Sequence, residues 1–386
     1  MEVSMFIRIT LLPHITLLLI SMFFSSLTLA ASPKIVWFST LQQDISDKSG
    51  FWRSVHDLVV ASAQDLDIDF RIYYAEENFL KMHRQVNMIL DNPKTRPDGI
   101  IFHNYKKMAP YILDKAEQLR VKSLIFNSGL NGGKLPLFPR KNYKHWIGQI
   151  LPDDEFAGAE LLHCLKSAAK NMFNDSRKEE FTVLAMEGNP SSKAYQSRKI
   201  GLQRALINSD MHFTQYFPAD WSRSKAREMF PTMLARYPKV NILWSANDNM
   251  ALGLIDAAEG SDLTFGENAV VGGIDWLAES IEAIQKGDMA CSVGGHFVDG
   301  MWSLILMYDY LNGFDFIDES KELSRQATFH TKMAVINKNN VDSYDQLTKK
   351  LQPDNLSKHD FKQYSRTHNS KIEHYNFSIA ELLHAL

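Results

Sequence analysis

The sequence predicts an α/β protein with parallel β-sheets, divided into two lobes with a cleft between them. Short apolar segments alternate with helical segments of about ten to fifteen residues, which is the pattern of repeated βαβ units. This alternation breaks once, over residues 128–143, where glycines and prolines gather in a candidate loop near a domain crossing. Similar units precede and follow the loop, and 386 residues are enough for two or three domains.

The units before the loop contain the clearest local signals. Val55, Leu58 and Val59 share one face of the first helix. Pro110 stands in the first turn of the third helix, a position that suits proline. The expected strands are 34–39, 69–74, 99–103 and 123–127, and the expected helices are 51–65, 80–90 and 110–120.

The units after the loop repeat this pattern. Their expected strands are 145–148, 181–186, 213–217, 240–244, 269–274, 290–293 and 328–336. Their expected helices are 154–170, 192–208, 222–237, a helix that opens at Met250, 277–286 and 300–311. A polar tail of mixed charge follows from residue 337, with helix-like stretches at 344–351 and 378–385.

Composition and motifs exclude several functional classes. A hydrophobic content of 45% and a charged content of 23% are ordinary for a globular protein with a buried core. The net charge of −3 argues against a protein that binds nucleic acid through phosphate contacts. The histidines show no zinc-binding spacing, and neither a phosphate-binding P-loop nor a hydrolase nucleophile elbow is present. We therefore expect no catalytic residue, no metal site and no cofactor.

The N-terminus has the pattern of a secretory signal peptide. Residues 11–29 are mostly apolar, Arg8 precedes them, and Thr28 and Ala30 offer small side chains for cleavage after Ala30. An uncleaved membrane anchor is the alternative, because this apolar run is just long enough to span a bilayer. Cleavage is favoured, so we expect a mature protein in the periplasm.

Two cysteines, Cys164 and Cys291, would then meet an oxidising compartment. Whether they form a disulfide is left open by the sequence, since it does not give the distance between their Cα atoms. Two buried free thiols are the favoured expectation.

A polar pair at a strand end is the strongest signal of a binding site. Asn247 and Asp248 follow the strand 240–244, just before a helix. In open α/β sheets, ligands bind beyond the carboxyl ends of the strands. An amide beside a carboxylate can hold the hydroxyl groups of a small polar molecule there.

Two further polar residues stand at strand ends. Asn127 closes the strand 123–127, and Asp275 follows the strand 269–274. Each can hydrogen-bond a ligand hydroxyl without a catalytic partner. Asp275 could instead cap the helix that follows, and the two roles are compatible.

Aromatic and basic side chains complete the candidate site. Phe51 and Trp52 follow the first strand and its polar loop, and Trp221 could form another wall of the binding pocket. Their aromatic rings could stack on a sugar-like ring. The alternative is that these rings lie in the hydrophobic core. The planar guanidinium of Arg198 offers several hydrogen-bond donors to hydroxyl groups or a carboxylate. The alternative is that Arg198 is a surface residue of its helix. His296 is a weaker candidate, since a single histidine is more often a satisfied polar residue.

Seven short segments, given at the end of this paragraph, together resemble a known family. Because these segments occur in the family's order along the sequence, the chain is similar to type I periplasmic substrate-binding proteins of the ribose-binding kind. The helix start at Phe51 and the segment 283–289 also resemble the autoinducer-binding branch, whose members pair with membrane sensors. The resemblance rests on 49–52 (SGFW), 97–101 (PDGII), 124–127 (LIFN), 198–201 (RKIG), 218–221 (PADW), 246–253 (ANDNMALG) and 272–275 (GGID).

The resemblance implies two doubly wound lobes, three crossover segments, a hinge and a ligand held by closure of the lobes. It also implies roles for the candidate residues. The positions of Phe51, Trp52 and Trp221 stack on the ligand in that family. Asn127, Arg198, Asn247 and Asp275 stand at positions that hydrogen-bond it.

The chain departs from the family pattern at three places. Ser49 and Gly50 replace an asparagine and a proline, and Asn127 followed by a serine replaces an aspartate–arginine pair. The family's last contact falls on Gly295, with His296 beside it. Since charge and side-chain donors are lost, ribose is not assumed as the ligand.

The sequence therefore predicts an exported solute-binding protein that presents a sugar or sugar-like molecule to an ABC importer. A periplasmic sensor that signals through a membrane receptor or kinase is the alternative, and an exported α/β hydrolase is a minor one. The part of the tail after Pro353 is expected to pack on the outside of the lobes or to dock a partner, and not to line the cleft. The expected parts are a signal peptide (1–30), a first lobe (31–143 and 295–325), a second lobe (144–294 and 326–340) and an extension (341–386).

Overall fold

The computed structural model describes residues 32–43, 50–130, 137–173, 181–207, 209–317, 327–351, 353–375 and 377. The predicted signal peptide and the predicted last helix, 378–385, lie outside these residues. Within the described ranges, no helix combines the length and apolar character that a membrane span requires.

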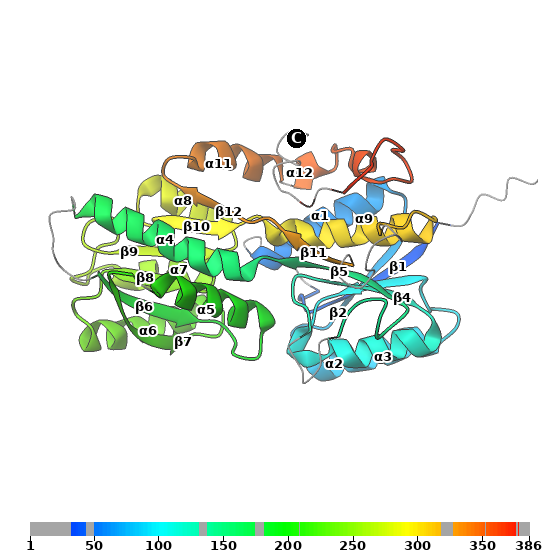
Figure 1. The fold of residues 1–386 in the computed structure, drawn as a ribbon, viewed down its shortest axis with the longest axis horizontal. Helices are drawn as coiled ribbons and strands as arrows, with labels where there is room; N and C mark the ends of the chain where they lie inside the picture. The colour runs from blue at the N-terminus through cyan, green and yellow to red at the C-terminus, as the bar shows by residue number, and fades with distance from the viewer. Residues whose placement is uncertain are drawn as a thin grey trace, which may run out of the picture. The chain divides into compact units, whose positions relative to one another are not determined.

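The described chain forms two six-stranded sheets, each with helices on both faces (Figure 1). The first sheet has the order β11-β5-β4-β3-β1-β2 and is parallel throughout. Its strands are β1 (Lys34–Ser39), β2 (Asp69–Tyr74), β3 (Gly99–Phe102), β4 (Lys122–Phe126), β5 (Trp146–Pro152) and β11 (Thr328–Thr331).

The second sheet has the order β12-β10-β9-β8-β6-β7, with only β12 antiparallel to its neighbour. Its strands are β6 (Phe181–Glu187), β7 (Met211–Pro218), β8 (Ile242–Ser245), β9 (Val270–Ile274), β10 (Cys291–Gly294) and β12 (Ala334–Asn337). Two parallel-sheet lobes with alternating strands and helices confirm the predicted fold class.

The first lobe buries the two faces of its sheet against different helices. Along β1, Trp37 joins the apolar cluster that includes α1, whereas Phe38 joins the cluster of α2 and α3. This is the expected result of side chains that alternate between faces along a strand. The helices are α1 (Phe51–Asp65), α2 (Phe79–Asp91), α3 (Ala109–Leu119) and α9 (Asp299–Leu311), with the short helix η1 (Tyr105–Lys107) after β3.

The second lobe is covered in the same manner. A Cβ on Gly272 of β9 would meet Leu161 of α4, whereas one on Gly273 would meet Asp248 of α7, so these two helices lie on opposite faces of the sheet. Its helices are α4 (Asp154–Met172), α5 (Lys193–Leu206), α6 (Arg223–Arg236), α7 (Asp248–Ala258) and α8 (Ala278–Lys286).

Three crossover segments join the lobes, and they correct the predicted boundaries. The chain passes between the sheets after β5, between β10 and α9 through the short helix η2 (His296–Val298), and between β11 and β12. Both β5 and β11 lie in the first sheet, although residues 144–152 and 326–331 were assigned to the second lobe. The predicted strand 328–336 is two strands in different sheets. Apolar content alone does not reveal these assignments, because the pairing partners of a strand decide its sheet.

Cys164 of α4 and Cys291 of β10 form a disulfide, with their Cα atoms 6.6 Å apart. The expectation of two free thiols was therefore wrong. The helix α4 lies directly on β10, a contact between segments 127 residues apart in the sequence.

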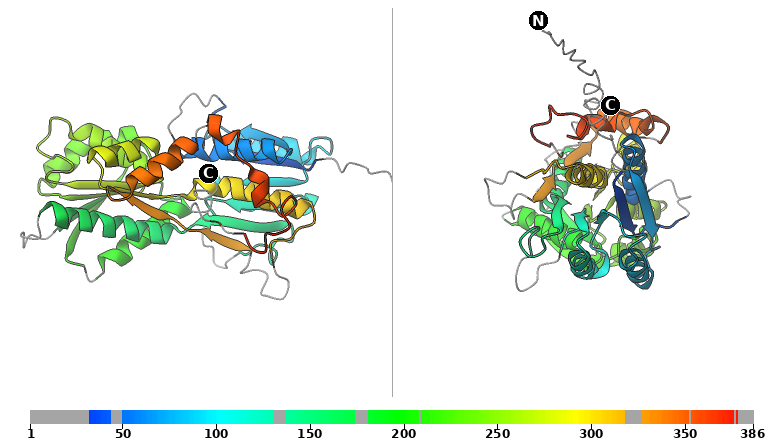
Figure 2. Two further views of the ribbon diagram at one scale, coloured as in Figure 1. Left: turned by 90° about the horizontal axis from the view of Figure 1, so that it is seen from above. Right: turned by 90° about the vertical axis from the view of Figure 1, so that its right-hand side faces the viewer.

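The C-terminal segment packs on helices of both lobes (Figures 1 and 2). The helix α11 (Val341–Lys350) lies against α8, and α12 (Pro353–Leu356) and η3 (Phe361–Tyr364) lie against α1. The carboxylate of Asp65, at the end of α1, accepts the backbone N–H groups of Phe361 and Lys362 at 2.8 and 3.1 Å.

Asp309 of α9 is the main anchor of this segment. Its fully buried carboxylate accepts hydrogen bonds from the backbone N–H groups of Arg366 (2.8 Å) and Thr367 (3.0 Å). It also accepts bonds from the hydroxyl groups of Ser365, Thr367 and Tyr375, the last two at 2.7 Å. One carboxylate thus holds the backbone of two tail residues and the hydroxyl groups of three.

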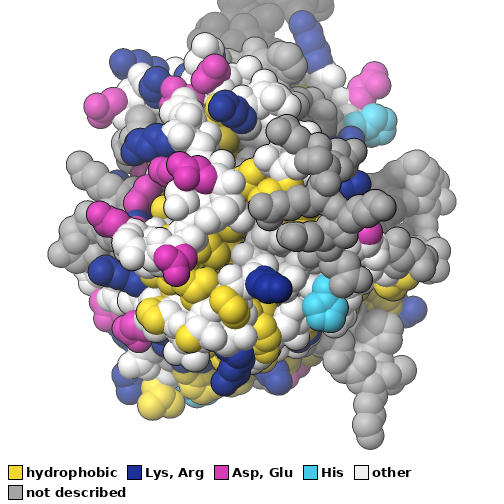
Figure 3. Space-filling view, turned by 90° about the vertical axis from the view of Figure 1, so that its left-hand side faces the viewer, with side chains coloured by type: hydrophobic (Ala, Val, Ile, Leu, Met, Phe, Trp, Pro, Cys, Tyr) yellow, Lys and Arg dark blue, Asp and Glu magenta, His cyan; other side chains and the backbone are white. Residues whose placement is uncertain are grey.

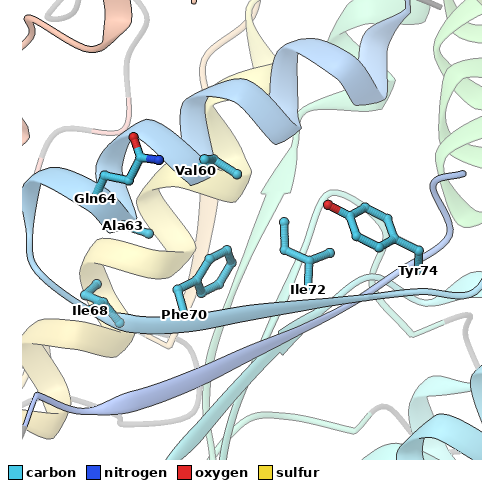
Figure 4. Close-up of a pocket in the computed structure, with 7 residues that line it drawn as sticks. All are labelled: Val60, Ala63, Gln64, Ile68, Phe70, Ile72 and Tyr74. Atoms are coloured by element: carbon cyan, nitrogen blue, oxygen red, sulfur yellow. The ribbon is translucent and has the colours of Figure 1, made fainter. Parts of the chain in front are cut away.

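The surface offers two further features. A hollow of about 250 Å³ lies between α1 and the edge strand β2, where Phe70, Ile72 and Tyr74 point toward the helix (Figure 4). None of the predicted site residues lines it. On the end face of the second lobe, basic and acidic side chains are interspersed over the described surface, and apolar side chains gather in its lower part (Figure 3).

We predict that Asp309→Ala detaches the segment 353–377 from α9. The substitution leaves several buried donors without an acceptor, which should lower the free energy of unfolding by roughly 3 kcal/mol or more. Urea unfolding and limited proteolysis of the tail would measure both effects. Asp342→Ala, which removes an exposed carboxylate of α11, is the control. Equal stability and equal protease resistance in the two variants would contradict the anchoring role.

Candidate functional site

Two aromatic rings begin the first helix at the carboxyl end of β1. Phe51 and Trp52 are the first residues of α1, are half-buried, and have ring centroids 5.3 Å apart. The Phe51 ring stacks on His296 at 4.5 Å, and the Trp52 ring lies 4.3 Å from the ring of His103. The structure therefore places this pair beside the second crossover and the end of β3.

His103, which the sequence analysis missed, follows β3 directly. Its Nε2 lies 3.3 Å from the hydroxyl of Thr40, and its Nδ1 has no partner among the described residues. Only 5% of the residue is exposed, and burial lowers its pKa to about 3. The neutral ring therefore presents an unused buried nitrogen. The sequence did offer one signal for His103 as a site residue, namely its position directly after a strand, which it shares with Asn127.

Arg198 of α5 is the centre of the second-lobe part. Its Nε donates to Asp154 at 2.8 Å, and its Nη1 donates to the carbonyl of Ala246 at 2.6 Å and approaches Asp275 at 3.5 Å. Its Nη2 lies 3.3 Å from Nε2 of His296. The residue is only 4% exposed, so the alternative of a surface arginine is wrong.

Asp275 and His296 face each other beside this guanidinium. The Asp275 Oδ1 lies 3.5 Å from His296 Nε2. Because arginine only donates, Nε2 of His296 is the acceptor and the proton resides on Nδ1, which has no partner among the described residues. Burial raises the pKa of Asp275 well above its usual value, against the influence of Arg198. Burial and Arg198 together lower the pKa of His296.

The helix-cap alternative for Asp275 is not what the structure shows. The N-cap of α8 is Leu277, and its N–H donates to Asp248 at 3.0 Å. Asp248 also accepts from the hydroxyl of Ser292 at 2.8 Å. Both oxygens of this buried carboxylate are engaged by Leu277 and Ser292, so the predicted grip of an Asn247–Asp248 pair on a ligand is corrected: the carboxylate ties β10 and α8 to the start of α7.

Asn247 and Trp221 form a second contact pair. Asn247 caps α7, because its Oδ1 accepts the N–H of Met250 at 2.9 Å, and its Nδ2 donates to the carbonyl of Trp221 at 3.3 Å. The Trp221 ring lies 5.7 Å from the guanidinium of Arg198. The site thus combines aromatic faces with buried donors and acceptors, which suits a small polar molecule with an apolar face. Among the described residues, no group of three or more His, Cys, Asp or Glu side chains could hold a metal ion.

Comparison with known proteins decides the family. The sequence pattern of the periplasmic binding protein domain matches residues 45–313. The chain belongs to this family.

Relatives of this periplasmic binding protein include sugar-binding proteins. The D-allose-binding periplasmic protein of Escherichia coli K12 is 31% identical over 129 residues, 33% of this chain and 41% of that protein. The ribose import binding protein of Haemophilus influenzae is 25% identical over 111 residues, 29% of this chain and 37% of that protein. These matches span less than half the length of either relative.

Solved structures match over most of the chain. A periplasmic sugar-binding protein from Pseudomonas fluorescens has a TM-score of 0.76 and 26% identity, and the match covers 91% of this chain and 99% of that one. A solute-binding protein from Actinobacillus succinogenes with bound D-allose has a TM-score of 0.67 at 18% identity, over 81% of this chain and 100% of that one. The second likeness shows the fold alone.

Seven of the eight predicted site residues of this periplasmic binding protein are joined by the contacts above, together with His103. The series runs from Trp52 through Phe51, His296 and Arg198 to Asp275, Trp221 and Asn247. Asn127 lies at the end of β4 with a positive φ of 60° and is not part of this series.

The buried neutral His103 predicts a pH dependence of stability. Unfolded, the ring takes up a proton below pH 6.5, whereas the folded ring does so only near pH 3. Its contribution to stability is therefore present above pH 6.5 and is lost as the pH falls toward 3. Between pH 7 and 5, His103→Gln should lose about 2 kcal/mol less unfolding free energy than the wild type.

Denaturant unfolding at both pH values would measure this difference. Burial raises the pKa of Asp248 to about 6, which acts in the opposite direction, but that effect is common to both proteins and cancels. Parallel pH profiles for the two proteins would contradict the assignment of a buried neutral ring.

Proposed function

We propose that this protein binds a monosaccharide or a similarly small, hydroxyl-rich molecule at the strand ends of its two lobes, without covalent chemistry. The observation that carries the proposal is the aromatic pair Phe51–Trp52 next to the buried Arg198, Asp275 and His296. Aromatic faces suit the C–H face of a sugar ring. The charged and imidazole groups suit its hydroxyl groups.

Two buried ring nitrogens support this role. Nδ1 of His103 and Nδ1 of His296 have no partner among the described residues, and buried polar atoms are rarely left without a hydrogen bond. We assign both to ligand hydroxyl groups. The relatives, a D-allose-binding protein and a ribose import binding protein, favour the same ligand class.

The proposed partner is a membrane permease of an ABC importer. Ligand contacts from both lobes would favour the closed arrangement, since a ligand shifts a conformational equilibrium toward the state it binds more tightly. The closed lobes would then present a joined surface to the permease. The import function in the name of the ribose relative supports this partner.

Export is part of the proposal. The apolar segment 11–29 and the small residues before Ala31 favour cleavage of a signal peptide, and the Cys164–Cys291 disulfide suits the oxidising periplasm. We predict that mature periplasmic protein begins at Ala31, within a residue or two, and carries no free thiol. N-terminal sequencing and mass spectrometry after alkylation would show this. An intact Met1 on cytoplasmic protein with two alkylated thiols would refute export.

Calorimetric titration with a panel of monosaccharides, including D-allose and D-ribose, tests ligand binding. For the sugar that binds, Trp52→Ala and Arg198→Ala should each weaken affinity roughly tenfold to a hundredfold, through loss of a stacked ring or of charged hydrogen bonds. Because Arg198→Ala also leaves buried carboxylates without their partner, thermal unfolding by circular dichroism shows first that each variant is folded at the temperature of the titration.

Matched controls separate binding from folding. Phe79→Ala removes an exposed aromatic ring of the first lobe. Arg223→Ala removes a paired arginine of the second lobe that contacts Asp256 and Glu279. Both controls should keep wild-type affinity. Wild-type affinity in Trp52→Ala and Arg198→Ala as well would remove these residues from the site, and a panel with no binding sugar would refute the ligand class.

A further inference from the structure

The backbone at the end of β9 adopts an unfavourable conformation. Asp275 and the next residue, Trp276, have φ values of 141° and 62°. Residues with a Cβ rarely occupy this half of conformational space, and they remain there only where the surrounding structure holds them. The position of the Asp275 carboxylate therefore depends on what holds Trp276.

The neighbouring strand β10 holds Trp276 from one side. The Trp276 N–H donates to the hydroxyl of Ser292, and its indole N–H donates to the carbonyl of Ser292, both at 3.2 Å. Asp248 fixes that same hydroxyl. A Cβ on Gly294 would lie 2.5 Å from the Trp276 ring, so the glycine gives the indole its space.

The C-terminal extension covers Trp276 from another side. Tyr344 of α11 packs edge-on against the indole, with ring centroids 4.7 Å apart and ring planes at 61°. The helix α11 lies along α8 (Figure 1), and α8 begins two residues after Trp276. The extension thus contacts the residue adjacent to the candidate ligand-binding carboxylate, although it lies outside the residues 45–313 that match the family pattern.

We propose that Tyr344 is a positioning residue for Asp275 and that it acts through the Trp276 ring. A shift of the indole rotates the backbone that carries Asp275. Its carboxylate would then lose its place 3.5 Å from both Arg198 and His296. This inference rests on the proposed function, in which Asp275 binds the ligand, and it makes α11 part of the binding machinery.

Affinity measurements with D-allose and D-ribose as probes test this role. For the sugar that binds, Tyr344→Ala should weaken binding roughly tenfold, the loss expected when one hydrogen bond to a charged group is misplaced. Tyr344→Phe should restore wild-type affinity, because the ring edge makes the contact. Tyr375→Ala, which removes another half-buried ring of the extension that lies on α9, should bind as the wild type does.

A second measurement needs no ligand. The amide hydrogens of Trp276 and Leu277 are bonded to Ser292 and Asp248. Their exchange with solvent should be faster in Tyr344→Ala than in the wild type, Tyr344→Phe or Tyr375→Ala. If neither sugar binds the wild type, the proposed ligand fails, and this exchange measurement alone decides whether Tyr344 holds the Asp275–Trp276 backbone.

Three results would overturn the positioning role. The first is wild-type affinity in Tyr344→Ala, the second is an equal loss of affinity in Tyr375→Ala, and the third is unchanged exchange at Trp276 and Leu277.

Discussion

The buried guanidinium of Arg198 is the interaction on which the candidate site depends. It joins the start of α4 through Asp154, the end of β8 through Ala246, the end of β9 through Asp275 and the second crossover through His296. Among the described residues it is the only lysine or arginine that is buried. Removal of one partner of a buried ion pair leaves an uncompensated charge, which is strongly destabilising. The four segments are thus held in one arrangement.

Close packing of two helices makes this arrangement possible. A Cβ on Gly158 of α4 would lie 2.0 Å from the carbonyl oxygen of Arg198, and one on Gly201 of α5 would lie 2.0 Å from that of Glu155. Only glycine permits such an approach of two backbones. It brings Arg198 within reach of Asp154, a residue that had no recognisable role in the sequence. The burial of the arginine therefore follows from two small residues on facing helices.

The extension shows how a segment outside the family pattern can serve the core fold. Asp309 and Asp65 anchor its distal part on α9 and α1, while Tyr344 in its proximal part contacts Trp276 beside the site. A polar, charge-mixed sequence gave no sign of these contacts, because they depend on carboxylates that belong to other elements. From the sequence alone, Asp65 and Asp309 would be interpreted as exposed helix residues.

The sequence by itself determined the local structure and the positions of the candidate residues. Apolar runs and helical periodicity placed nearly every strand and helix within a few residues. Polar residues at strand ends marked Asn247 and Asp275 as candidates. Both kinds of signal depend only on neighbouring residues. The tertiary structure alone decided that β5 and β11 belong to the first sheet, that Cys164 meets Cys291, and that Asp248 accepts the hydroxyl of Ser292. It also brought His103 beside Trp52. Each of these outcomes depends on a partner far away in the sequence, and pairing between distant segments is decided only when the sheets and helices pack.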